Sequence, residues 1–371
     1  MSSHEHIDFA TMPPCSLCRV PVTDPNAPPQ HIAIVRFSAL GDVVMVAAAI
    51  RALRHELPDA KITWITSPLA YSLLEGLDGV EFLVTDKPRS LSDYRAFYCL
   101  LGEHRFDAVL AMQANLRINL LYPAIRAPIK VGFDRTRARE LQWLFCNRSI
   151  PFKNDHLADS FLAFVTELTG TPARAEWALP ITTAEQAWAR KKTAALPRPL
   201  IALHPVSSKI ERNWLTPRYA KVIELAVKYF DCGIVITGGN AADERAICER
   251  LAQVAPTHTL NLCGQTTPKQ LAAVLAEADV LIAPDTAAVH LARAVDTPVV
   301  GLYAVAPARL TGPYQRTTYC VDRYDEAVRE YLGKDPARLP WNTRVHHSGA
   351  MALIEVEDVM QQLSRALGDR I

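Results

Sequence analysis

The stretch Ile32–Asp42 (IAIVRFSALGD) decides the fold of this chain, because it joins an apolar strand to the start of a helix through one short turn. Apolar side chains then recur at helical spacing, which predicts a helix over Val43–Glu56 that packs on a sheet. Gly41 permits the sharp turn and the close approach of a ligand to the backbone. Asp42 therefore stands beside a cleft, where it is a candidate catalytic carboxylate. The alternative is that Asp42 only offsets the dipole of the helix.

The composition indicates a globular protein with a small or membrane-borne ligand. The chain has 371 residues, of which 49% are hydrophobic, and this allows two domains with ample cores. A formal net charge of +1 argues against bulk nucleic-acid binding. No apolar run approaches the roughly 20 residues that span a bilayer, and the N-terminus is not signal-like. We expect a cytoplasmic protein that is at most peripherally attached to a membrane.

The eight cysteines are scattered, which is typical of reduced thiols rather than of a disulfide framework. Cys15 and Cys18 form one CxxC, and a zinc site that joins them to His346 and His347 is an alternative with weak support. We expect no metal.

Strand-like and helix-like segments alternate along the chain in two series, which is typical of parallel, doubly wound sheets. Residues 1–30 are proline-rich and predicted to be a flexible extension. The α/β architecture is therefore two Rossmann-like domains that face a cleft, over residues 31–180 and 181–350. The predicted strands are Ile32–Arg36, Lys61–Thr66, Val80–Val84, Asp107–Ala111 and Ile129–Gly132, then Leu200–His204, Gly233–Thr237, Thr259–Leu262, Val280–Ala283 and Val299–Leu302.

The loop after the first strand of the second series carries two hydroxyls and two cations. Ser207 and Ser208 precede Lys209 and Arg212, a set that can hold a diphosphate by charge-assisted hydrogen bonds. The alternative is an ordinary solvated basic loop.

The next strand ends in paired glycines that open a helix. Gly238 lets the backbone approach a nucleotide, and Glu244 can accept hydrogen bonds from ribose hydroxyls. The pattern is not GxGxxG, so a dinucleotide fingerprint is absent. As structure alone, these are turn residues and a first-turn carboxylate.

A third strand end, Ala283–His290, also begins a helix. Backbone N–H groups at Thr286 and Ala287 attract a phosphate, and Asp285 can bind sugar hydroxyls. His290 is either a ligand contact or, more simply, a hydrogen-bonded core histidine. Together the three loops suit a sugar nucleotide, with Asp42 across the cleft as a base.

With these motifs the chain resembles glycosyltransferase family 9, the bacterial lipopolysaccharide heptosyltransferases, from about Ile32 to Tyr314. The matching pieces are Ser38–Asp42, Met112–Arg117, Ala138–Glu140, Phe145–Arg148, Lys209–Trp214, and Asp285–His290 followed by Pro298–Tyr303.

The resemblance implies a GT-B fold in which a C-terminal helix, residues 351–371, returns to the first domain. It implies inverting, metal-independent transfer from ADP-heptose, with Asp42 as the general base. Arg212 takes the place of the family's phosphate-binding lysine, and Ala287 replaces its usual glycine, which changes the geometry at both places.

The implied acceptor is the anionic inner core of lipid A at the inner membrane surface. Ser38, Gly41, Arg117 and Arg139 are its predicted contacts. Arg36, Arg126, Arg135 and Arg137 are further candidates from the same domain, although any single arginine is more simply a solvated surface residue. We expect a monomer. A sugar-nucleotide epimerase of the same architecture and a non-catalytic nucleotide-sugar-binding protein are the alternative functions.

Overall fold

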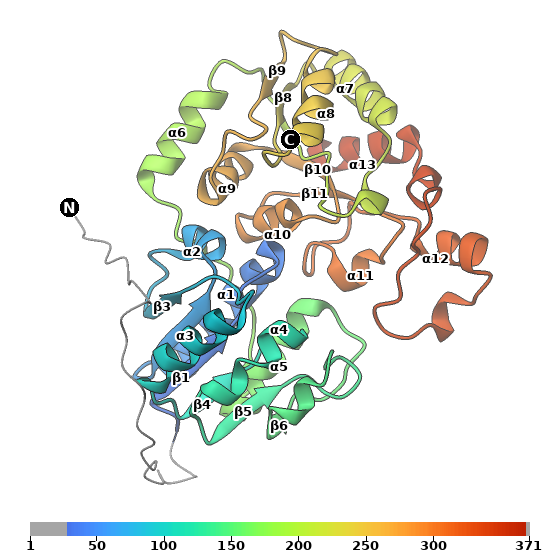
Figure 1. Cartoon of the computed structure of the whole chain (residues 1–371). Helices are drawn as coiled ribbons and strands as arrows, with labels where there is room; N and C mark the ends of the chain where they lie inside the picture. The colour runs from blue at the N-terminus through green and yellow to red at the C-terminus, as the bar shows by residue number, and fades with distance from the viewer. Residues whose placement is uncertain (1–27, 369–371) are drawn as a thin grey trace.

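Two parallel sheets of six strands, each in its own domain, make up the computed structural model, which describes residues 28–368 (Figure 1). The first sheet has the order β3-β2-β1-β4-β5-β6 and the second β12-β11-β10-β7-β8-β9. Both orders are the doubly wound arrangement 3-2-1-4-5-6, in which ligands bind where the order reverses. The reversals lie between β1 and β4 in the first domain and between β7 and β10 in the second.

The strands agree closely with those expected from the sequence. The first sheet contains β1 (His31–Val35), β2 (Lys61–Thr66), β3 (Val80–Val84), β4 (Ala108–Leu110), β5 (Ile129–Gly132) and β6 (Arg148–Ser149), and the second β7 (Leu200–Leu203), β8 (Gly233–Ile236), β9 (Thr259–Asn261), β10 (Val280–Pro284), β11 (Val299–Tyr303) and β12 (Val321–Asp322). Only the edge strands β6 and β12 had not been predicted, because two residues carry no periodic pattern.

Helices cover both faces of each sheet. In the first domain they are α1 (Leu40–Glu56), α2 (Pro68–Leu74), α3 (Leu91–Gly102), α4 (Leu116–Asn119), α5 (Leu157–Thr169) and the short turns η2 (Tyr122–Ala124) and η3 (Gln142–Leu144). In the second they are α6 (Thr183–Thr193), α7 (Thr216–Phe230), α8 (Ala242–Ala252), α9 (Pro268–Glu277), α10 (Ala287–Ala294), α11 (Ala308–Thr311), α12 (Tyr324–Ala327), α13 (Val356–Gly368), η4 (Ile210–Arg212), η5 (Val328–Leu332), η6 (Pro336–Arg338) and η7 (Ala350–Leu353).

The C-terminal helix does not pack where the family resemblance had implied. The buried residues of α13 belong to the core between the second sheet and α7, and they include Val359 and Leu363, both 0% exposed. Figure 1 shows α13 beside α7 and β10 in the upper domain. The helix therefore covers the second sheet, and its expected return to the first domain is wrong. An apolar stripe shows that a helix is buried on one side but does not say against which surface.

The two domains meet through packed side chains. Val44 of α1 and Leu73 of α2 lie in the core cluster of the second domain, while Tyr314 from the second half lies in the core of the first. The Tyr314 hydroxyl donates to Asp159 at 2.5 Å, and Lys269 Nζ donates to the carbonyl of Glu75 at 2.6 Å. These contacts hold the carboxyl ends of both sheets toward each other.

Candidate active site

Asp42 occupies the third position of α1 and is held by two donors. Arg36 donates from Nη2 to Oδ2 of Asp42, and the backbone N–H of Ala39 donates to the same oxygen at 3.2 Å. Arg36 is fixed in turn, because its Nη1 donates to the carbonyl of Met112 at 2.5 Å and its guanidinium lies 5.3 Å from the centre of the Phe161 ring. The carboxylate is thus oriented, and the side chain keeps 22% of its surface exposed.

The start of α1 faces the second domain across the joint with α10. A Cβ placed on Gly41 would stand 2.6 Å from Cδ2 of His290 and 3.4 Å from Cα of Ala287. Only glycine allows this approach. Asp42 is also close enough to influence the charge of both His290 and Asp285. The candidate base therefore lies at the joint between the domains.

His290 is buried, 5% exposed, within α10. Burial lowers its pKa to about 4, although the nearby Asp42 carboxylate acts in the opposite direction. Its Nδ1 has no hydrogen-bond partner among the described residues. The simpler interpretation of a core histidine is right about burial, but the imidazole is held by packing against Gly41 and not by a hydrogen bond at Nδ1.

Asp285 organises the side of the site that the second domain forms, opposite Asp42 and here called the wall. Its Oδ2 lies 3.0 Å from Nη1 of Arg212 and accepts from the Thr311 hydroxyl at 3.3 Å. Burial raises the pKa of Asp285, while Arg212 opposes that shift. Asp285 is only 8% exposed, so its carboxylate binds neighbouring protein groups and has little contact with solvent. Asp285 therefore positions Arg212, a role that the sugar-hydroxyl hypothesis had not included.

The residues of the diphosphate hypothesis are brought together but differ in availability. The Ser207 hydroxyl is buried and donates to the carbonyl of Asp285 at 3.1 Å, so it ties two loops together. Ser208 and Lys209 are exposed, and Lys209 forms no ion pair with any described residue. The Nε of Arg212 is buried without a partner within residues 28–368.

Arg344 is a cation of this wall that the sequence motifs did not reveal. It lies near Asp285 and Arg212 of its own domain and near Arg139 of the first domain. Burial lowers its pKa, and its Nη1 is buried with no hydrogen-bond partner in the described chain. The next residue anchors the loop, because the N–H of Val345 donates to the carbonyl of Val305 at 3.0 Å. The wall thus has an excess of positive charge over the single Asp285 carboxylate.

The glycine loop after β8 is shaped by Glu244. Oε1 of Glu244 accepts from the N–H of Gly239 at 2.7 Å. A Cβ on Gly238 would lie 2.8 Å from that oxygen, and one on Gly239 would lie 2.7 Å from Oε2. Both glycines are thus required by the close approach of the carboxylate to the loop, the structural role weighed for them above.

The start of α10 is capped by Thr286, whose hydroxyl accepts from the N–H of Ala288 at 3.1 Å. Ala287, which stands in place of the family's glycine, lies against Gly41 at the domain joint. Thr286 and Ala287 are both partly exposed, so the first turn of α10 is not fully covered by protein.

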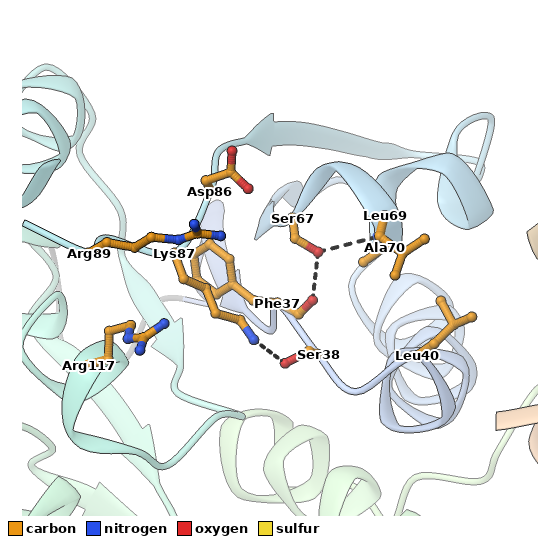
Figure 2. Close-up of a pocket in the computed structure, with 10 residues that line it drawn as sticks. All are labelled: Phe37, Ser38, Leu40, Ser67, Leu69, Ala70, Asp86, Lys87, Arg89 and Arg117. Atoms are coloured by element: carbon orange, nitrogen blue, oxygen red, sulfur yellow. Dashed lines mark hydrogen bonds between the residues drawn. The ribbon is translucent and has the colours of Figure 1, made fainter. Parts of the chain in front are cut away.

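A pocket of about 330 Å³ lies in the first domain around Ser38 (Figure 2). Lys87 donates to the Ser38 hydroxyl, and Arg89 and Arg117 line the same side of the pocket. The pKa of Lys87 is lowered mainly by burial and further by the charges of Arg117 and Arg36. Leu40 and Leu69 form the other side. This arrangement suits an anionic group attached to a less polar one.

The candidate acceptor arginines separate into several environments. Arg117 and Arg139 are exposed, as an acceptor contact requires. Arg137 is not available, because it is 6% exposed and donates to Asp134, to Ser160 at 2.6 Å and to the carbonyl of Pro151 at 2.6 Å. Its place among the acceptor candidates is wrong.

Two side chains in or beside the resemblance motifs hold the backbone around the site. Oε1 of Gln113 accepts from the N–H of Phe37 at 2.7 Å, which fixes the turn before Asp42. The carboxamide of Asn119 donates to the carbonyls of Arg139 and Glu140 at 3.0 and 2.8 Å. Within the part of the chain that the structure describes, no group of three or more metal-binding side chains occurs. Cys15 and Cys18 lie outside the described residues.

Comparison with known proteins shows the family of this chain. A model described as glycosyltransferase family 9 (heptosyltransferase) matches residues 94–334. The chain belongs to glycosyltransferase family 9. It is 32% identical over 340 residues to the lipopolysaccharide core heptosyltransferase OpsX of Haemophilus influenzae. The matched region covers 91% of this chain and 97% of the relative.

Solved structures of family members share the fold. A family 9 glycosyltransferase from Veillonella parvula has a TM-score of 0.73 at 20% identity and covers 92% of this chain and 97% of its own. The ADP-heptose lipopolysaccharide heptosyltransferase II of Escherichia coli has a TM-score of 0.71 at 17% identity. The match covers 92% of this chain and 99% of that structure. The chain is accordingly a glycosyltransferase with the GT-B fold.

Proposed function

We propose that this glycosyltransferase moves a heptose from ADP-heptose, with inversion and without a metal, to the inner core of lipopolysaccharide. The observation that carries the proposal is the position of Asp42, held by Arg36 at the domain joint and facing the loops that contain Arg212 and Asp285. The family membership and the names of its relatives support the sugar and the acceptor.

In the proposed reaction, Asp42 accepts a proton from an acceptor hydroxyl as that oxygen forms a bond to the anomeric carbon. The bond from that carbon to the ADP oxygen breaks on the opposite face, and ADP leaves with the electron pair. Arg36 keeps the carboxylate in one orientation, which reduces the entropy lost on reaching the transition state.

Charge that develops on the departing ADP requires stabilisation. Lys209, Arg212 and Arg344 supply cations on the donor side, and the open first turn of α10 supplies backbone dipoles. Fixed charges in a site that excludes water stabilise such an anion far more than they do in bulk solvent. We propose that these groups take the role that a metal ion has in other transferases.

The acceptor is proposed to enter from the first domain. Ser38, Lys87, Arg89 and Arg117 line a pocket on the same turn that carries Asp42. Arg–phosphate and Arg–carboxylate pairs are the strong, oriented contacts by which an anionic sugar is recognised. We propose that the pocket holds an anionic group of the inner core and that the enzyme works at the membrane surface as a monomer.

The alternative functions predict different products. An epimerase of the same architecture would release a free or epimerised sugar without any acceptor, and a non-catalytic binder would retain the donor unchanged. Neither is favoured by the family to which the chain belongs.

The test offers ADP-heptose and a panel of other nucleotide sugars with a delipidated inner-core oligosaccharide. We expect ADP release that depends on the oligosaccharide and a product heavier by one heptose residue, in the anomeric configuration opposite to that of the donor. ADP release that is independent of the acceptor, or a preference for another nucleotide sugar, would contradict the proposal.

A further inference from the structure

One stretch of the first domain exposes an unusual concentration of large apolar side chains. Six of the fourteen exposed large apolar residues of the described chain fall between residues 116 and 152. Soluble monomers usually expose such side chains singly, and larger groups mark interaction sites. The six, here called the apolar rim, are Leu116 (51% exposed), Leu120 (41%), Leu141 (53%), Trp143 (41%), Leu144 (56%) and Phe152 (46%).

The two segments that carry five of the six residues, α4 and η3 with the loop before it, are joined to each other. The N–H of Leu116 donates to the carboxylate of Glu140, and Asn119 donates to the backbone of residues 139 and 140. These bonds join α4 to the loop that leads into η3. Tyr98 of α3 extends the contact, since its hydroxyl donates to the carbonyl of Leu120 at 2.9 Å. The rim is thus a surface built from several elements and not one frayed loop.

The sequence that carries the apolar rim is rich in positive charge. Residues 88–153 contain eleven Lys or Arg and five Asp or Glu, a net charge of +6, whereas the whole chain has a net charge of +1. The guanidinium of Arg135 lies 4.9 Å from the centre of the Trp143 ring, so apolar and cationic groups are interleaved. Lys and Arg side chains close to an anionic bilayer are attracted to it.

The apolar rim adjoins the proposed acceptor pocket. An open hollow of about 730 Å³ is lined by Pro88, Arg89, Tyr94, Leu116, Arg117 and Leu120. It shares Arg89 and Arg117 with the pocket that contains Ser38 and Lys87. A path therefore runs from the rim to the turn that carries Asp42. In residues 28–368 no helix is long and apolar enough to cross a membrane.

We propose that the apolar rim and the arginines around it dock this enzyme on an anionic lipid bilayer. In this orientation, a lipid-linked acceptor keeps its acyl chains in the membrane while its sugar enters the Ser38 pocket. The inference rests on the proposed function, because a lipid-linked acceptor gives the surface its use. Apolar side chains with interleaved arginines match the interface of such a bilayer in both hydrophobicity and charge.

The test measures sedimentation of the full-length protein with vesicles of phosphatidylethanolamine and phosphatidylglycerol, and with vesicles of neutral phosphatidylcholine. We expect binding to the anionic vesicles that weakens with salt. The variant Leu141→Ser/Leu144→Ser should bind at least tenfold more weakly, and Arg135→Glu should weaken the preference for anionic lipid. Tyr229→Ser, which alters a residue that is 65% exposed on α7 of the second domain, is the matched control and should bind normally.

The outcomes test the docking proposal and the proposed function separately. Normal transfer to the delipidated oligosaccharide by the leucine variant, with lost transfer to lipid-linked acceptor in vesicles, supports docking. Equal vesicle binding by the leucine variant and the natural protein would overturn the docking proposal. A leucine variant that changes the oligomeric state of the protein but not its vesicle binding would overturn it as well. If no acceptor is ever glycosylated while vesicle binding persists, the proposed function fails and the surface stands.

Discussion

The substitution Gly41→Ala tests how closely the two domains must approach at the catalytic turn. The added Cβ would stand 2.6 Å from Cδ2 of His290, whereas carbon atoms in contact prefer about 3.5–4.0 Å. Either the imidazole or the start of α1 must therefore move by about 1 Å. Overpacking of this kind costs about 1–3 kcal/mol. A displacement of that size at the reacting groups also lowers the rate by up to about 100-fold.

The assay pairs denaturant unfolding with the transfer rate in a double-mutant cycle. In the His290→Ala background the nearest remaining atom to the new methyl group is Cα of Ala287 at 3.4 Å. The stability penalty of Gly41→Ala should then fall below about 0.5 kcal/mol, a coupling within the range for residues in contact. Gly368→Ala is the control, since a Cβ there meets nothing within 4 Å. An equal penalty in both backgrounds would refute the proposed contact.

Three further predictions concern charge. Arg344→Ala should weaken ADP binding about tenfold or more, because it removes a half-buried cation beside Arg212 whose Nη1 has no hydrogen-bond partner in the described chain. Arg338→Ala, which alters a side chain that is 88% exposed, should leave ADP affinity unchanged in calorimetry. Equal affinities for both variants would argue against the donor role. Burial lowers the pKa of His156 to about 4, as it does for His204 and His290, so the unfolded state takes up these protons first as the pH falls. Each histidine should therefore lower the stability by about 1.4 kcal/mol per pH unit between about pH 6.5 and pH 4. His156→Asn should reduce the slope of pH-dependent unfolding by that one share, and an unchanged slope would exclude this histidine as a contributor. Chelation with EDTA should leave initial transfer rates unchanged, and loss of activity restored by a divalent cation would overturn the metal-free mechanism.

Most of the fold could be predicted from the sequence because most of its strands are apolar runs. Ten strands were predicted within one or two residues of their ends, since buried parallel strands are continuous apolar runs. The strand–turn–helix around Gly41 was also predicted, and it places Asp42 at the joint between the domains. The edge strands β6 and β12 were missed because each pairs through only two residues.

Other features depend on tertiary contacts that no local pattern encodes. The amphipathic stripe of α13 indicated a buried face, but only the assembled structure shows that it covers the second sheet. The internal engagement of Asp285 with Arg212 could not be predicted from either motif alone, because the two residues come from different strand ends. Arg344 and Lys87 lie on irregular loops with no motif, so their positions in the cleft emerged only from the fold.

The most direct test of the central claim is the transfer rate of Asp42→Asn at saturating ADP-heptose and acceptor. The amide keeps the size of the side chain but cannot take the acceptor proton. We predict that kcat falls by about 10²- to 10⁴-fold while ADP affinity stays within about twofold. A kcat within tenfold of the natural enzyme, with normal product stereochemistry, would contradict the assignment of Asp42 as the base.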